Sequence, residues 1–578
     1  DNLSTAAAMA AASFWAFDLY LQEVFYKLGL ESPLAAFGVM LTLYQFSRFE
    51  KEWRTSPVSP ARIAALALTA ALAMFSRLDL VFLAFLGGLW IVLRGKPMRA
   101  LLPLDMLIIF FSMVVSAALR VGVMQYNSTY ANSALTAAAL AMVFKVLALY
   151  FFGAYRHPRA LSFWETVRSA ALGAAAGSLL SAAASVLLFQ MDVGKGLPRS
   201  AFVIDWALSL VLFLALRAAM YWFGSRGIRP GAQLVSPLAE LRINWRRWLS
   251  DSAAYYGVVG GLLALYMTYN KIAFGSYFPV SGQIKRWWGS LLNTVYEKPS
   301  PDFPAFLGVS YESSYEAWQP LTSFLVGLAK WIYPLYPGAD TLDERYYIVL
   351  FAFIALALAV LLANPRRARR AASNMALIPL AAGCGFHVLS YTATAYGGTK
   401  EWYWVGEALL VVLGISLLVR LSLPFQKIKL VRFSLQTAAL ALGIWMAYQL
   451  GMAVRYTMPY NYFPPGLPYM DVLPYLEENT PPGSVIGMTG GGNVGYFIRD
   501  RAIVNMDGLI NSYEYFRALR EGRAAAYLIE RGVDVVFANP RLLALPPYYG
   551  QFDPYFEIYS QYGGKNLIYL LKEPKYAP

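Results

Sequence analysis

Cysteine and histidine are almost absent from the chain. Its 578 residues include one cysteine, Cys384, and two histidines, His157 and His387. A single cysteine excludes an intrachain disulfide and a cysteine metal cluster, and two histidines argue against a histidine metal site. Carboxylates would therefore have to hold any metal ion. We expect no metal site of the cysteine or histidine kind.

Charged residues are also scarce, at 14% of the chain, whereas 58% of the residues are hydrophobic and 16% are aromatic. A soluble protein of this composition could not cover its surface with polar groups, but a bilayer accepts apolar helices whose backbone groups bond internally. The net charge of +14 comes from basic residues scattered over short loops, as in membrane proteins. The composition predicts a polytopic α-helical membrane protein and no nucleic-acid partner.

Apolar runs of about 17 to 25 residues, the length that spans a bilayer, recur along the first four-fifths of the chain. We expect about thirteen transmembrane helices from these runs. Their approximate cores are residues 6–21, 33–49, 60–75, 80–93, 101–119, 135–152, 167–189, 202–223, 253–272, 346–363, 375–391, 403–419 and 433–452.

The charge of the connecting loops predicts the orientation of these helices. Short loops rich in Lys and Arg remain in the cytoplasm. If the expected helices alternate in direction, the basic loops all lie on one side, and these loops are 48–54, 94–99, 156–159, 226–247, 366–370 and 427–429. We therefore expect a multi-pass protein of the plasma membrane, with an outer loop at 275–345 and an extracytoplasmic C-terminal region.

The C-terminal region, residues 456–578, has the pattern of a small α/β domain. Short β-type runs are bounded by turn residues, and a helical run begins at Ser512 and ends before Gly532. The expected strands are 484–488, 502–506, 533–538 and 566–571. The glycine run 490–495 follows the first strand, but a strand is expected after it and no P-loop Lys-Ser/Thr pair follows, so a glycine turn explains it better than a nucleotide site.

Polar residues at the expected outer ends of the helices are the candidates for function. Ionisable groups at membrane depth cost several kcal/mol unless they are paired, which makes them functional candidates. Structural explanations stay open: Arg77 and Asp79 could form an ion pair that locks a hairpin, Trp402 could belong to an interfacial aromatic belt, and Asp507 could serve a turn. The full set is Glu31, Arg77, Asp79, Ser281, Lys285, Glu401, Trp402, Tyr403 and Asp507.

These residues belong to motifs that follow one another in a recognisable order. They are Gly-Leu-Glu-Ser at 29–32, Arg-Leu-Asp at 77–79, Pro-Val-Ser-Gly-Gln-Ile-Lys at 279–285, Glu-Trp-Tyr-Trp at 401–404 and Asn-Met-Asp-Gly-Leu-Ile-Asn at 505–511. In this order they resemble the GT-C class of membrane glycosyltransferases. The likeness is nearest to bacterial arabinofuranosyltransferases and, more distantly, to protein mannosyltransferases, and it covers residues 1 to about 95 and about 250 to 578.

The resemblance implies an activity and a role for each residue. Such enzymes transfer a sugar from a polyprenyl-phosphate donor to a glycan, lipid or protein acceptor of the cell envelope outside the cytoplasm, usually with inversion. Lys285 and Arg77 would bind the donor phosphate as charge-assisted donors. The sugar or acceptor subsite would comprise Glu31, Asp79, Ser281, Glu401, Trp402, Tyr403 and Asp507. Whether a divalent cation is needed is left open.

Two departures from the family pattern matter. Family members carry a catalytic aspartate in the first outer loop, directly after the first helix. No such loop precedes residue 6, so we expect an N-terminal portion to be missing. We therefore assign no catalytic residue, and position alone does not qualify Asp1 or Asp18. Residues 101–225 resemble instead the four-helix membrane domain that precedes capsule-type nucleotide-sugar dehydratases. We read them as an inserted module that could contact protein partners or membrane lipid.

The expected organisation has four parts: a first core segment 1–100, the inserted module 101–225, a second core segment 226–455 and the extracytoplasmic domain 456–578. A transporter or flippase for lipid-linked glycans remains an alternative function, although no internal repeat is visible and the charges gather at one face. A non-catalytic scaffold subunit of a larger membrane assembly is the third.

Overall fold

The computed structural model describes residues 4–26, 31–191, 195–223, 235–296, 302–311, 316–332, 341–422, 428–457 and 470–575. The chain divides into two compact units, and each is described by itself. Unit 1 comprises Asp1–Leu262, Ser300–Thr394 and Thr399–Tyr456, and unit 2 comprises Leu263–Pro299, Ala395–Gly398 and Thr457–Pro578.

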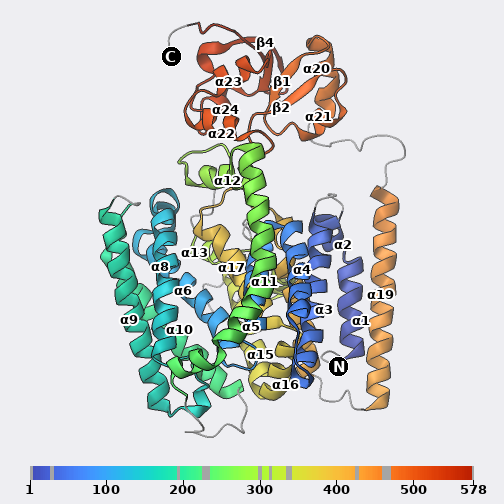
Figure 1. Ribbon diagram of the computed structural model, residues 1–578. Helices are drawn as coiled ribbons and strands as arrows, with labels where there is room; N and C mark the ends of the chain where they lie inside the picture. Colours follow the sequence, from blue (N-terminus) through green and yellow to red (C-terminus); the bar gives the residue numbers. More distant parts are fainter. Residues whose placement is uncertain are drawn as a thin grey trace. The chain divides into compact units, whose positions relative to one another are not determined.

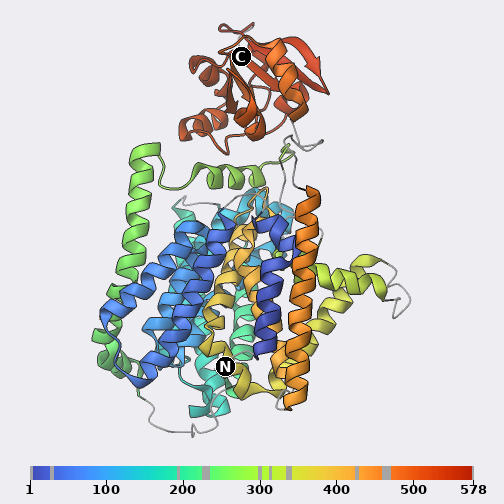
Figure 2. The same ribbon diagram turned by 90° about the vertical axis from the view of Figure 1, so that its right-hand side faces the viewer.

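Unit 1 is built of helices (Figures 1 and 2). Its longer helices are α1 (Thr5–Phe17), α3 (Ser32–Thr55), α4 (Pro60–Ser76), α5 (Val81–Val92), α6 (Met98–Val121), α8 (Ala131–Phe151), α9 (Phe163–Gln190), α10 (Arg199–Phe223), α14 (Leu321–Trp331), α15 (Leu342–Ala363), α16 (Pro365–Asn374), α17 (Leu377–Ala393), α18 (Val405–Ser422) and α19 (Lys429–Thr457). Shorter turns lie between them: α2 (Leu19–Leu21), η1 (Gln22–Tyr26), η2 (Leu78–Leu80), α7 (Val123–Gln125), η3 (Tyr126–Tyr130), η4 (Pro158–Ala160), α13 (Phe303–Phe306) and η5 (Glu401–Tyr403). The division between the units falls within the long helix α11 (Pro237–Phe274).

Local sequence signals fix where several helices begin. Ser162 and Glu165 form a capping box at the start of α9, and Thr341 and Glu344 form another at the start of α15. Ser59 accepts a hydrogen bond from the backbone of the first turn of α4, which begins with a proline. These caps satisfy backbone donors that no helical partner could reach.

Seven helices in the described part of the chain are long and apolar enough to cross a membrane, or up to eight if the bent pair α16 and α17 forms one span. The seven are Met98–Val121, Val123–Phe151, Phe163–Gln190, Arg199–Phe223, Leu342–Ala363, Val405–Ser422 and Lys429–Tyr456. The chain is thus a multi-pass membrane protein by helix length and hydropathy. The other expected spans coincide with helices that are shorter, such as α1, α4 and α5, or more polar, such as α3 and α11.

Helices α6, α8, α9 and α10 pack against one another as a four-helix group, which occupies the region expected to be an inserted module (Figure 1). Small residues allow α8 and α9 to approach closely. A Cβ on Gly177 would lie 2.5 Å from the Cα of Lys145, and a Cβ on Gly173 would lie 2.9 Å from the side chain of Leu149. Small residues at helix contacts are typical of membrane proteins, where packing rather than water drives association.

Two buried ion pairs hold this four-helix group together. Lys145 of α8 donates to Asp205 of α10 over 2.6 Å, and Asp205 also accepts from Ser112 of α6 over 2.7 Å. Arg217 of α10 donates to Asp105 of α6 over 2.7 Å. Lys145 and Asp105 are fully buried, and Asp205 is almost so. Asp205 therefore joins α10 to α6 and α8, and Asp105 joins α6 to α10.

Removing one partner of the Lys145–Asp205 pair should cost more than removing both. Lys145→Met leaves an uncompensated buried carboxylate, and we expect it to lower the free energy of unfolding by about 3 to 5 kcal/mol. The double variant Lys145→Met/Asp205→Leu removes both charges and should recover most of that loss. Unfolding of the purified protein in detergent measures both. A double variant no more stable than the single one would contradict this account.

Unit 2 contains a five-stranded mixed sheet with the order β2-β1-β3-β5-β4. The strands are β1 (Val485–Met488), β2 (Ala502–Asn505), β3 (Val535–Ala538), β4 (Phe556–Tyr562) and β5 (Lys565–Leu570). β1 pairs in parallel with β2 and β3, and β5 runs antiparallel to both β3 and β4. The helices of this unit are α12 (Val280–Ser290), η7 (Met470–Val472), α20 (Leu473–Asn479), α21 (Gly492–Phe497), α22 (Tyr513–Arg520), α23 (Ala524–Glu530) and α24 (Pro540–Leu543), with the turn η8 (Asp553–Tyr555). The α/β character expected from the sequence is confirmed.

The details of unit 2 differ from the expectation in three places. The edge strand β4 was not expected, because its polar sequence Phe-Glu-Ile-Tyr-Ser-Gln-Tyr leaves most of its side chains exposed. The helical run 512–531 is two helices, since Gly522 between them adopts φ +74°. The glycine run leads into the short helix α21 rather than directly into a strand.

Helix α12 and the segment Ala395–Gly398 belong to unit 2, although both precede residue 456. Ile284 and Trp288 of α12 form one apolar cluster with Phe516 of α22. Trp288 also stacks on Tyr296, with 3.8 Å between ring centroids, and the Tyr296 and Tyr548 hydroxyls lie 2.5 Å apart. The motif that contains Lys285 is thus packed onto the sheet domain.

Candidate functional site

Arg77 is the centre of a polar cluster in unit 1. It directly follows α4, and its backbone N–H closes that helix on the carbonyl of Ala73. Its guanidinium donates to Asp79 through Nη2 (2.5 Å) and Nε (3.3 Å), and Nη1 donates to Glu31 (2.9 Å) and to the Trp402 carbonyl (3.1 Å). A guanidinium is suited to such bidentate pairing because its donors form a rigid fork.

Asp79 accepts more hydrogen bonds than the ion pair alone provides. Besides Arg77, its Oδ2 accepts from the Tyr391 hydroxyl over 3.1 Å and lies 3.3 Å from Nε2 of His387. The side chain is only 12% exposed. A carboxylate surrounded by so many donors is held in its charged form and in one position.

His387 extends this network into the helices. Its Nδ1 lies 2.9 Å from Oε1 of Glu407, which is fully buried in α18. His387 and Tyr391 are four residues apart on α17, so both point from the same helix face toward Asp79. A continuous chain of contacts therefore runs from Glu31 through Arg77, Asp79 and His387 to Glu407.

Aromatic rings enclose the cluster. The Arg77 guanidinium carbon lies 4.9 Å from the centroid of the Tyr403 ring, within the range of a cation–π contact. The ring of Trp404 lies 5.2 Å from that of His387 and 5.5 Å from that of Tyr391. The backbone of Trp402 contributes its carbonyl, which also accepts from Ser32. Such walls lower the local dielectric and strengthen the ionic contacts.

A second group of carboxylates gathers around Tyr20 in unit 1. Glu316, Glu401 and Asp18 are close enough to this tyrosine to interact with it electrostatically. Burial raises the pKa of Glu316, to which Gln319 donates a hydrogen bond, and Glu401 adds a smaller effect of the same sign. Glu316 is half-buried and remains accessible. Glu316 is thus an accessible carboxyl group that binds a proton more tightly than an ordinary glutamate does.

Lys285 and Ser281 lie in unit 2. Lys285 is buried, and its Nζ donates to the carbonyl of Gly398 over 2.7 Å. Ser281 lines a cavity of about 460 Å³ together with the end of α11 and residues 509–514. The Pro-Val-Ser-Gly motif and the end of the Asn-Met-Asp-Gly-Leu-Ile-Asn motif therefore share one cavity within unit 2. The other lining residues that bear amide, hydroxyl or carboxyl groups are Tyr266, Asn270, Ser276, Asn511, Ser512, Tyr513 and Glu514.

Asp507 has a local structural role. Its Oδ1 accepts from the backbone N–H of Leu509 over 2.9 Å, and its Oδ2 accepts from that of Gly490 over 3.2 Å. The side chain is buried at 5% exposure. These bonds join the turn after β2 to the glycine run after β1.

The structure brings together some of the predicted residues and adds others. Glu31, Arg77, Asp79, Tyr403 and the backbone of Trp402 form one cluster in unit 1, while Glu401 belongs to the carboxylate group around Tyr20. Lys285, Ser281 and Asp507 belong to unit 2. The sequence did not reveal the roles of His387, Tyr391, Glu407 and Glu316. A carboxylate within an apolar helix was the available signal for Glu407.

Among the residues that the structure describes, no group of three or more His, Cys, Asp or Glu side chains is placed to hold a metal ion. No model of a known protein family matches the chain, and no curated protein matches it.

The bidentate pair of Arg77 and Asp79 should contribute measurably to stability. Arg77→Lys keeps the charge but loses the fork geometry, and we expect it to lower the free energy of unfolding by about 1.5 to 3 kcal/mol, the range for hydrogen bonds to charged groups. Glu31→Gln should cost less than about 1 kcal/mol, because this side chain is 46% exposed. Thermal unfolding in detergent measures both, and equal losses would show that the outer contact matters as much as the inner one.

Proposed function

We propose that the protein is a membrane glycosyltransferase of the GT-C kind, which transfers a sugar from a polyprenyl phosphate to an acceptor of the cell envelope. The observation that carries the proposal is the cluster of ionisable side chains at the helix ends around Arg77. Its members are Glu31, Arg77, Asp79, His387 and Glu407, with Tyr391, Tyr403 and Trp404 around them. The order of sequence motifs supports it independently.

The proposal includes a membrane topology and a cellular location. About thirteen helices cross the plasma membrane, the basic loops lie in the cytoplasm, and the α/β domain is extracytoplasmic. The shorter apolar helices α1, α4 and α5 are then spans that require a locally thinner bilayer. The cluster around Arg77 lies on the outer side in this topology, where a lipid-linked donor could enter from the bilayer.

The chemistry requires a base for the acceptor hydroxyl. In the proposed step, the acceptor oxygen forms a bond to the anomeric carbon, the bond from that carbon to the phosphate oxygen breaks, and the polyprenyl phosphate leaves with the bonding electrons. The base takes the hydroxyl proton. Asp79 is poorly suited to this role, because Arg77 and its other partners hold its negative charge.

Glu316 fits the role of the base better. Burial raises its pKa, and its side chain is partly open, so it can accept a proton from a bound hydroxyl. Glu31 and Glu401, the more exposed carboxylates, would contact the sugar or the acceptor, and Trp402 and Tyr403 would offer apolar ring faces to sugar or isoprenoid.

The phosphate-binding roles of Lys285 and Arg77 come from the resemblance and stay predictions. Arg77 already donates to Asp79, Glu31 and the Trp402 carbonyl. A phosphate oxygen could reach its Nη1 by taking the place of the half-exposed Glu31 carboxylate. Arg77 would then bind the leaving group while Asp79 keeps the guanidinium oriented.

Sugar transfer by the purified protein tests the proposed function. Full-length protein in vesicles, supplied with radiolabelled polyprenyl-phosphate sugars, should move label to a polar acceptor in an envelope extract. Glu316→Gln should lower the rate by about 10²- to 10⁴-fold, the usual contribution of a general base, while the protein remains folded.

Glu530→Gln, a substitution of an exposed carboxylate on α23, is the matched control and should transfer at the unaltered rate. Label that crosses the vesicle membrane without being transferred would support a flippase and overturn the enzyme. Binding of the donor with neither transfer nor translocation would support a scaffold. Transfer that survives Glu316→Gln would remove Glu316 from the mechanism without removing the activity.

A further inference from the structure

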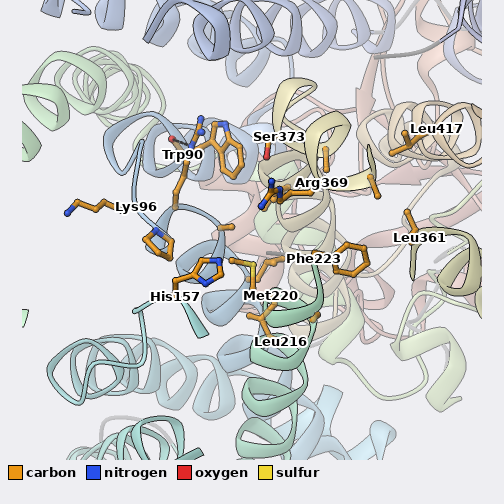
Figure 3. Close-up of a pocket in the computed structure, with 18 residues that line it drawn as sticks. Trp90, Lys96, His157, Leu216, Met220, Phe223, Leu361, Arg369, Ser373 and Leu417 are labelled. Carbon is orange, nitrogen blue, oxygen red and sulfur yellow. Dashed lines mark hydrogen bonds between the residues drawn. The ribbon is translucent and has the colours of Figure 1, made fainter. Parts of the chain in front are cut away.

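A cavity of about 500 Å³ lies in unit 1 between the four-helix group and the helices α15 to α18 (Figure 3). Its walls come from the turn between α5 and α6, the loop after α8, the end of α10, and helices α15, α16, α17 and α18. None of these residues belongs to the cluster around Arg77. The cavity is therefore a separate candidate binding site.

The inner walls of the cavity are apolar. Leu216, Met220 and Phe223 project from successive turns of α10, and Leu361 and Leu417 face the same space from α15 and α18 (Figure 3). These are flexible aliphatic and aromatic side chains, which an acyl chain can contact without losing hydrogen bonds. An acyl chain that enters from the bilayer exchanges one hydrocarbon environment for another, so this wall admits it at little cost in free energy.

The polar part of the cavity is cationic. Lys96, Arg99, His157 and Arg369 line it, and none of the lining residues is acidic (Figure 3). Lys96 and Arg99 have carboxylate partners outside the lining, at Glu240 and Glu50.

Arg369 is exposed and makes no hydrogen bond or ion pair within the described part of the chain. Burial lowers the pKa of His157, and the positive charges of Arg159 and Arg369 lower it further. The electrostatic potential at this end of the cavity is thus positive and not fully neutralised.

We propose that this cavity binds an acidic phospholipid, with the headgroup at Arg369 and Lys96 and an acyl chain along α10. The combination of a cationic end with an apolar wall selects an anion that carries a hydrocarbon chain. The basic loops that supply Lys96, His157 and Arg369 are those assigned to the cytoplasmic side, whose leaflet holds anionic lipids that attract basic segments. Basic pockets between transmembrane helices on that side are suited to such headgroups.

The site also has a structural consequence. Its walls combine α10 of the four-helix group with α15, α16 and α18 of the remaining helices of unit 1. Near it, Trp222 of α10 donates to the carbonyl of Leu362 of α15 over 3.2 Å. A bound lipid fills the space between these two groups of helices and links them.

Photolabelling with a lipid probe tests the site. The full-length protein in detergent is incubated with phosphatidylglycerol that carries a diazirine in one acyl chain, and with the matched phosphatidylcholine. We expect phosphatidylglycerol to label peptides of α10 and α18 at least fivefold more strongly, since one basic residue near an anionic headgroup accounts for about fivefold in affinity.

Two variants separate the headgroup contact from the acyl-chain contact. Arg369→Gln should lower the labelling about fivefold, and Met220→Trp should lower it by filling the apolar wall. The matched controls are Arg367→Gln, a charge loss on the same helix outside the lining, and Val211→Trp, on an exposed position of α10. Both controls should be labelled like the unaltered protein.

Three results would overturn the proposal. Equal labelling by both lipids would show that the charge of the headgroup does not affect binding. Unchanged labelling in both Arg369→Gln and Met220→Trp would place the lipid elsewhere. Displacement of the probe by inorganic phosphate at the concentration of the lipid would show that the cavity takes a free anion.

Discussion

Charges buried among apolar helices have to be compensated, and this constraint determines how unit 1 is assembled. Removing an ion from water costs several kcal/mol, which only a close and well-oriented partner can offset. The pairs Arg77–Asp79, Arg94–Asp251, Arg99–Glu50, Lys145–Asp205 and Arg217–Asp105 all lie in or at the ends of apolar helices. Apart from Arg77–Asp79, their members come from different helices, so satisfying each charge also fixes which helices are neighbours.

The pairs at the two ends of the helices differ in their consequences. Arg94, Arg99 and Glu50 are buried and paired, and the Arg99 guanidinium carbon lies 3.7 Å from the centroid of the Trp90 ring. The cluster around Arg77 is less closed, because Glu31 is half-exposed. A fully buried ion pair can only stabilise the fold. In a partly exposed pair, a ligand can replace the protein carboxylate.

The sequence predicted the parts of the structure that depend on local signals. Apolar runs and loop charge indicated a multi-pass helical protein, and alternating strand and helix patterns indicated the α/β sheet. Arg77 and Asp79 are two residues apart, so their pairing could be suggested. The pairing of Asp105 with Arg217, which are 112 residues apart, could not be, because nothing local specifies which helices pack together.

The errors have equally local causes. The sequence does not predict β4, because this edge strand contains Glu, Ser and Gln and lacks a regular apolar alternation. The run 512–531 has the pattern of one helix, because the helix-forming residues on both sides of Gly522 outweigh that single glycine. The role of His387 has no local sequence signal, because a lone histidine on an apolar helix is usually a packed core residue. In the structure it is buried between the carboxylates of Asp79 and Glu407.

The position of His387 bears on the chemistry of the whole cluster. A neutral imidazole could donate to only one of its two carboxylate neighbours, whereas a protonated imidazole can donate to both. With Arg77 on its other side, Asp79 is then held between two cations, which stabilise its negative charge and reduce its basicity. Asp79 is therefore poorly able to take a proton from another group. In the reaction that we propose, proton transfer would therefore use a carboxyl group beside this network, and the network itself holds Arg77 and the helix ends in place.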